Sequence, residues 1–153
     1  MPLLLEFVRD FFRAEAWSFS ELTPDAALAA QYVGENGKWS CLAEVSEELQ
    51  QCLFYSLSPV RVPDAKRQSV AEFITRANDG LNIGNFEMSF ETGEVVFKTS
   101  IDVLDTALDQ TLVRNLAFAN VITMDRFLPG LLSVIFGNAA PRDAVAAAAD
   151  AAR

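Results

Sequence analysis

The chain has 153 residues, of which 51% are apolar and 22% are charged. A chain of this size is expected to fold as one domain, because it can bury about 70% of the surface that its unfolded state exposes. Acidic residues outnumber basic ones by 21 to 12, for a net charge of −9, which disfavours binding to nucleic-acid phosphates or to an anionic membrane surface.

The N-terminal segment predicts an amphipathic helix. Apolar residues recur there at helical spacing, with charged residues on the other side; they are Leu4, Leu5, Val8, Phe11 and Phe12. The segment lacks a positively charged start, and Glu6 follows only three leucines, so we do not expect a signal peptide. We expect the helix to end at Trp17-Ser18-Phe19 and the protein to be cytoplasmic.

Three strands are expected next, over residues 26–33, 38–45 and 51–58. The first two are joined by Gly34-Glu35-Asn36-Gly37, which predicts a hairpin because Asn-Gly tolerates positive φ. The third strand is apolar on both faces. We therefore expect it to lie in the centre of the sheet or to be covered on both sides.

Cys41 and Cys52 fall on consecutive expected strands. A tight turn at Ser46-Glu47 would place them opposite each other, where a disulfide is geometrically allowed. A four-residue turn over 46–49 would instead place Cys41 opposite Phe54. Since one bridge does not make a secreted disulfide framework, two reduced and packed thiols are the favoured interpretation.

A rigid connector and a further helix and hairpin follow. Two prolines in Pro59-Val60-Arg61-Val62-Pro63 exclude a helix or an inner strand. The spacing then predicts a helix over residues 64–78. Period-two alternation over 86–90 and 95–101, on either side of Thr92-Gly93, predicts two antiparallel strands with one wet face.

The last helix is expected to start near Asp105 or Leu108 and to run to about Phe136. Apolar residues cover so much of its circumference that it needs two packing partners. The sheet is one of them, and a second copy of the chain is the simplest choice for the other.

Polar residues make this helix a buried one rather than a membrane span. Asp125, Arg126 and Pro129 interrupt its apolar stretch, whereas a span needs about 20 largely uncharged residues. Pro129 should kink or break the helix and leave one backbone carbonyl without its partner.

The expected order is α-β-β-β-α-β-β-α, an α+β fold with an antiparallel five-stranded sheet and helices packed on it. Residues 1–137 are expected to form the single domain. The alanine-rich segment 138–153 has little apolar bulk to dock, and we expect it to be a frayed or disordered tail.

The residue types argue against an enzyme. There is no histidine, and there are only two cysteines, which removes the commonest general base and most zinc sites. No glycine-rich phosphate loop occurs. We therefore predict no catalytic, cofactor or metal residues.

Carboxylates leave one alternative open. Glu87 and Glu91 share an expected strand face, with Glu94 across the turn. They could form a weak cation site or an acid/base pair of a carboxylate- or metal-dependent enzyme. A solvated strand face is the favoured interpretation.

Six residues are candidates for contact with a protein partner: Trp39, Leu53, Tyr55, Asp125, Arg126 and Phe127. Asp125 and Arg126 are charges among apolar residues, so they must be paired or reach water. They could anchor a partner peptide, or they could pair within the fold or across a dimer axis. Trp39 and Tyr55 could equally be core residues.

Four segments in order resemble the YbjN family of bacterial proteins. They are Gly34-Glu35-Asn36-Gly37-Lys38-Trp39, Pro59-Val60-Arg61-Val62-Pro63, Gly84-Asn85-Phe86-Glu87, and the stretch from Asn120 through Thr123-Met124-Asp125-Arg126-Phe127 to Pro129. The resemblance spans about residues 5 to 135.

The resemblance implies a regulator of sensory transduction with a fold similar to class I type III secretion chaperones. Those chaperones are small, acidic, homodimeric α+β proteins that bind extended segments of client proteins. The expected function is therefore a non-enzymatic, regulatory or chaperone-like homodimer that binds a protein segment. A subunit or signalling component of a larger assembly is the alternative.

Overall fold

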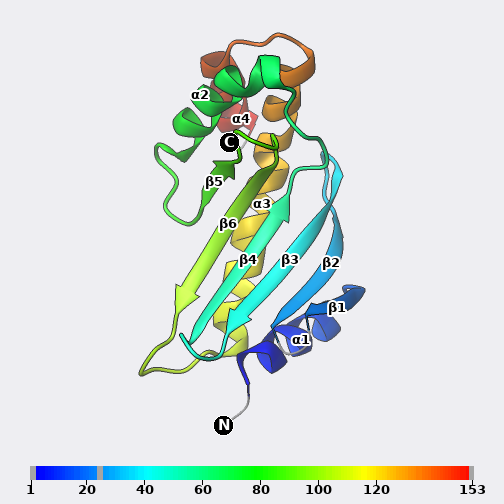
Figure 1. Ribbon diagram of the computed structural model, residues 1–153, viewed down its shortest axis with the longest axis vertical. Helices are drawn as coiled ribbons and strands as arrows, with labels where there is room; N and C mark the ends of the chain where they lie inside the picture. The colour runs from blue at the N-terminus through cyan, green and yellow to red at the C-terminus, as the bar shows by residue number, and fades with distance from the viewer. Residues whose placement is uncertain (1–2, 24–25, 152–153) are drawn as a thin grey trace.

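The computed structural model describes residues 3–23 and 26–151 and consists of helices packed on one six-stranded sheet (Figure 1). The strands are β1 (Phe19–Thr23), β2 (Ala27–Val33), β3 (Lys38–Ser46), β4 (Gln51–Leu57), β5 (Asn85–Met88) and β6 (Val95–Asp102). The helices are α1 (Leu4–Ala14), the short 3-10 helix η1 (Asp64–Lys66), α2 (Arg67–Asn78), α3 (Gln110–Phe136) and α4 (Pro141–Ala151). The predicted α+β class is confirmed.

The sheet is antiparallel throughout, in the order β1-β2-β3-β4-β6-β5. It has one strand more than the five expected. The additional strand, β1, pairs with β2 at the edge of the sheet, and its residues Ser20 to Thr23 are exposed. An exposed edge strand has little apolar patterning, so sequence periodicity does not reveal it.

The pairing of β3 with β4 decides the state of the two cysteines. Val45 lies opposite Cys52, and Cys41 lies opposite Ser56, so neither of the two turns considered from the sequence is formed. The loop occupies residues 47–50 instead. Both cysteines are free and buried, as predicted, because this register keeps them on different rungs of the ladder.

Helix α3 runs along one face of the sheet, behind the strands in Figure 1, and packs on β4 and β6. Asp109 caps its first turn by accepting a hydrogen bond from the backbone N–H of Leu112 at 2.8 Å. By length and composition alone this helix could cross a membrane, but half of its most apolar window is buried inside the protein. It is the central helix of the core.

Helix α4 corrects the expectation of a frayed tail over the described part of segment 138–153; residues 152 and 153 lie outside the described residues. It packs against α2 and α3 and buries Ala144 and Ala148. Small side chains let the helices approach closely: a Cβ added at Gly130 of α3 would lie 3.1 Å from the carbonyl oxygen of Ala144. The side chains of α4 are small, and close contact between the backbones of α3 and α4 compensates for the apolar surface that they lack.

Besides the sheet, helices of the same chain cover part of α3, while Ile122 and Phe136 on it stay exposed. Helix α1 packs on the N-terminal part of α3 at one end of the sheet, and α2 and α4 gather at the other end (Figure 1). Proline does not break the helix, since α3 continues through Pro129 to Phe136.

Candidate functional site

Two of the candidate partner contacts lie in the core. Trp39 and Phe127 are each only 2% exposed. The indole N–H of Trp39 donates to the Ser56 hydroxyl at 2.9 Å, and the Phe127 ring contacts Phe73 and Phe86. A partner cannot reach these two side chains in this conformation.

Leu53 and Tyr55 lie on the face of the sheet opposite α3. Alternate residues of β3, β4 and β6 gather there into a cluster, the open-face patch, made up of Leu42, Leu53, Tyr55, Leu57 and Val96. All five are half-buried. Neighbouring strands bring them together, because Leu42 pairs with Tyr55 and Leu57 pairs with Val96.

Charged residues border the open-face patch. Glu44 lies opposite Leu53, and Lys98 lies opposite Tyr55. The Lys98 ammonium also pairs with the Glu87 carboxylate at 3.1 Å. Burial raises the pKa of the Tyr55 hydroxyl, with nearby Glu44 and Glu87 adding to the rise and Lys98 opposing it. Tyr55 therefore presents a neutral O–H donor at neutral pH.

The carboxylates near the second hairpin do not converge on one point. Glu87 pairs with Lys98, and Glu94 lies 4.0 Å from Arg61. The Glu91 carboxylate instead accepts from the Ser89 hydroxyl at 3.4 Å. Within residues 3–23 and 26–151, no three acidic or cysteine side chains are grouped to hold a metal ion. Each of the three carboxylates therefore interacts with a different side chain.

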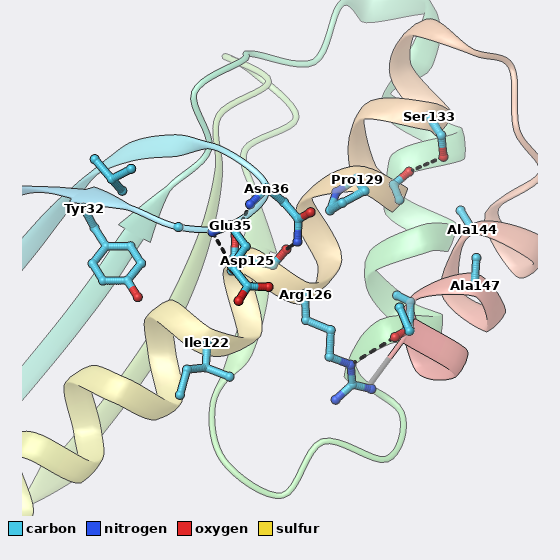
Figure 2. Close-up of a pocket in the computed structure, with 15 residues that line it drawn as sticks. Tyr32, Glu35, Asn36, Ile122, Asp125, Arg126, Pro129, Ser133, Ala144 and Ala147 are labelled. Atoms are coloured by element: carbon cyan, nitrogen blue, oxygen red, sulfur yellow. Dashed lines mark hydrogen bonds between the residues drawn. The ribbon is translucent and has the colours of Figure 1, made fainter. Parts of the chain in front are cut away.

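A groove of about 880 Å³ opens on the helix side of the molecule, between the β2–β3 hairpin, α3 and α4 (Figure 2). Its walls are mainly aliphatic and small residues, with Tyr32 at one side. The residues that line it include Tyr32, Val33, Ile122, Arg126, Pro129 and Ala148. Val33 and Ile122 are 72% and 60% exposed, so apolar surface faces solvent there.

Asp125 anchors the β2–β3 hairpin to α3. Its two carboxylate oxygens accept hydrogen bonds from the backbone N–H groups of Glu35, at 3.0 Å, and Asn36, at 2.8 Å. Gly34 is required at this contact, because a Cβ there would overlap the Asp125 carboxylate. The structure thus gives Asp125 a positioning role within the fold.

Arg126 lies in the same groove, but its side chain points away from that of Asp125, toward α4 (Figure 2). Its Nε donates to the carbonyl oxygen of Ala148 at 3.3 Å, and its guanidinium carbon lies 4.8 Å from the centre of the Phe127 ring. Among the described residues no carboxylate lies within ion-pair distance of it. Its two terminal amino groups make no hydrogen bond to a residue within 3–23 and 26–151.

Sequence reasoning missed several residues of both surfaces. Leu42, Leu57 and Val96 alternate with core residues on their strands, so the period-two pattern contained a signal for them, but only the strand register places them side by side. Ile122 and Ala148 become groove residues only because α4 folds back against α3.

Comparison with known protein families matches residues 5–133 to the YbjN family, described as "Putative bacterial sensory transduction regulator". The chain belongs to the YbjN family. A solved structure titled "Crystal structure of YbjN, a putative transcription regulator from E. coli" is similar to it, with a TM-score of 0.57 and 14% identity over 82% of this chain and 89% of that chain. At that identity the likeness shows a shared YbjN fold. No curated protein sequence matches.

Proposed function

We propose that this YbjN-family protein is a non-enzymatic regulatory module that acts as a homodimer and binds a segment of a partner protein. The open-face patch supplies the apolar contact surface. One observation carries the proposal: the helices pack on one side of the sheet, and the opposite side has an apolar centre.

A solvated face of an antiparallel sheet is normally polar. Leucines and an aromatic residue at the centre of such a face are more typical of a protein contact. Glu44 and the Lys98–Glu87 pair form a charged border around them, which is the usual arrangement of an apolar centre and a polar rim. The family description as a regulator is consistent with this role.

The test of the homodimer is its molar mass in solution. Size-exclusion chromatography with light scattering on the full chain, at about 100 μM, should give twice the monomer mass. Changing both Leu53 and Tyr55 to Thr removes apolar contact area but keeps a strand-forming residue, and should weaken dimerisation by at least about tenfold.

Ser100→Thr is the matched control, since Ser100 pairs with Leu53 on the same face and the change removes no apolar area. Its mass profile should equal that of the wild type. A wild-type protein that stays monomeric, or a double variant that dimerises as well as the wild type, would refute the dimer. Binding of partner segments is then tested by crosslinking in cell extract, with the double variant as reference.

A further inference from the structure

We propose that the groove between the β2–β3 hairpin, α3 and α4 binds a small organic carboxylate with an apolar body, and that Arg126 receives the carboxylate. This site lies on the helix side of the protein, away from the open-face patch. It does not depend on the partner binding proposed above.

Arg126 is held ready for such a ligand. The Phe127 ring supports its guanidinium, and the bond from Nε to the Ala148 carbonyl fixes the plane of the group. One edge of the guanidinium is thereby used by the protein. The two terminal amino groups, which make no hydrogen bond to any described residue, form the paired donors that match the two oxygens of a carboxylate.

The groove also suits an apolar body. Its volume of about 880 Å³ falls within the usual range of ligand sites, roughly 300–1,000 Å³. Tyr32, Val33, Ile122 and Pro129 offer aromatic and aliphatic contacts along it. Because Val33 and Ile122 are exposed, a ligand that covered them would remove apolar surface from water.

The acidic residues of the groove do not pair with the Arg126 guanidinium, so they do not occupy the place of a ligand carboxylate. Both Asp125 oxygens are engaged with the hairpin backbone, and Glu35 is exposed at the surface. The specificity for an anion must therefore come from hydrogen bonds donated at short range rather than from the overall field, which is negative. The competing interpretation is that Arg126 only caps the C-terminal end of α4.

Three probes with the same ring separate these interpretations: phenylacetate, phenylacetamide and phenethylamine. In a titration of the full chain followed by ¹H–¹⁵N NMR, phenylacetate should shift the amide signals of Ile122 and Ala147. The neutral amide and the cationic amine should bind at least about tenfold more weakly. No shift with phenylacetate up to about 10 mM, or tighter binding of the amine, overturns the proposal.

Arg126→Gln keeps a donor for the Ala148 carbonyl but removes the paired donors, and should weaken phenylacetate binding by at least about tenfold. Arg142→Gln is the control, because it removes the same charge from an exposed position of α4 outside the groove; binding should change less than about twofold. Should Arg126→Gln unfold, Arg126→Lys gives the same comparison, since Lys keeps the charge without the fork. Equal affinity in the Arg126 and Arg142 variants would leave Arg126 as a helix cap only.

Discussion

At the scale of single residues, Asn120 joins the central helix to the sheet. It is fully buried, and its amide nitrogen donates to the backbone carbonyl oxygens of Phe54, at 2.8 Å, and Phe97, at 2.9 Å. Those two residues belong to β4 and β6, so one side chain of α3 ties two strands together. Within the described residues its own oxygen has no partner, and both strand carbonyls fix which way the amide points.

Replacing Asn120 by Asp should be far more harmful than replacing it by Ala. The carboxylate would face two carbonyl oxygens without a donor, and we expect the free energy of unfolding to fall by about 3–5 kcal/mol. Asn120→Ala only removes the donors and should cost about 1–3 kcal/mol. Urea denaturation of the two variants at neutral pH measures the difference. Equal losses would mean that packing volume, rather than hydrogen bonding, matters at this position.

At the scale of elements, the β2–β3 hairpin and α3 complete each other's hydrogen bonds. Pro129 has no N–H, so the carbonyl four residues earlier, that of Asp125, loses its helical donor. The Asn36 side-chain amide donates to this carbonyl at 3.0 Å. The hairpin thus supplies the bond that the proline removes, which is consistent with the continuity of α3 through this position.

A double-mutant cycle tests whether the Asn36 side chain replaces the hydrogen bond that Pro129 cannot donate. Asn36→Ala should lower the free energy of unfolding by about 1 kcal/mol in the wild type, because the Asp125 carbonyl loses its donor. In a Pro129→Ala background the same change should cost clearly less, since the restored N–H of residue 129 can bond that carbonyl. Thermal unfolding of the four proteins gives the coupling energy. A coupling of zero would contradict the assigned role of Asn36.

The two edge strands of the sheet, β5 and β1, also differ in how further strand pairing is hindered. At the β5 edge, the Asn78 side chain accepts from the Phe86 N–H at 2.7 Å and donates to its carbonyl at 3.1 Å. At Phe86, one amide side chain from α2 therefore makes the two hydrogen bonds that a further strand would make. At the other edge β1 carries an irregularity between Glu21 and Thr23, which is a common way of disturbing an exposed edge.

At the scale of the whole molecule, the two buried thiols couple stability to pH. Burial raises the pKa of Cys41 and of Cys52 from 9.0 to about 12. Above about pH 9 the unfolded chain loses these protons while the folded chain keeps them. The folded state then binds more protons, so its stability falls as pH rises, and the contribution is fully present only below that range.

We therefore expect the free energy of unfolding to fall between pH 9 and pH 11 more steeply in the wild type than in a Cys41→Ala, Cys52→Ala double variant. The difference in slope should be up to about 1.4 kcal/mol per pH unit for each thiol. Denaturation curves across that range provide the measurement. Parallel pH profiles would show that the thiols titrate alike in the folded and unfolded states.

Much of this protein was determined by the sequence alone. The α+β class, most elements to within a few residues and the YbjN family all follow from local sequence patterns, because periodicity and turn residues act over a few neighbouring positions. The edge strand β1 did not follow, since its pattern is weak. The docking of α4 did not either, because alanine reports helix propensity but not a partner.

Only the tertiary structure decided which surfaces remain free. Whether Tyr55 faces outward depends on which side of the sheet the helices cover, and the pattern of its strand, which is apolar on both sides, cannot say which that is. Likewise, Asp125 and Arg126 are adjacent in the chain but have different tasks, because the hairpin meets one and α4 meets the other. Such contacts join residues far apart in the sequence, where local patterns carry no information.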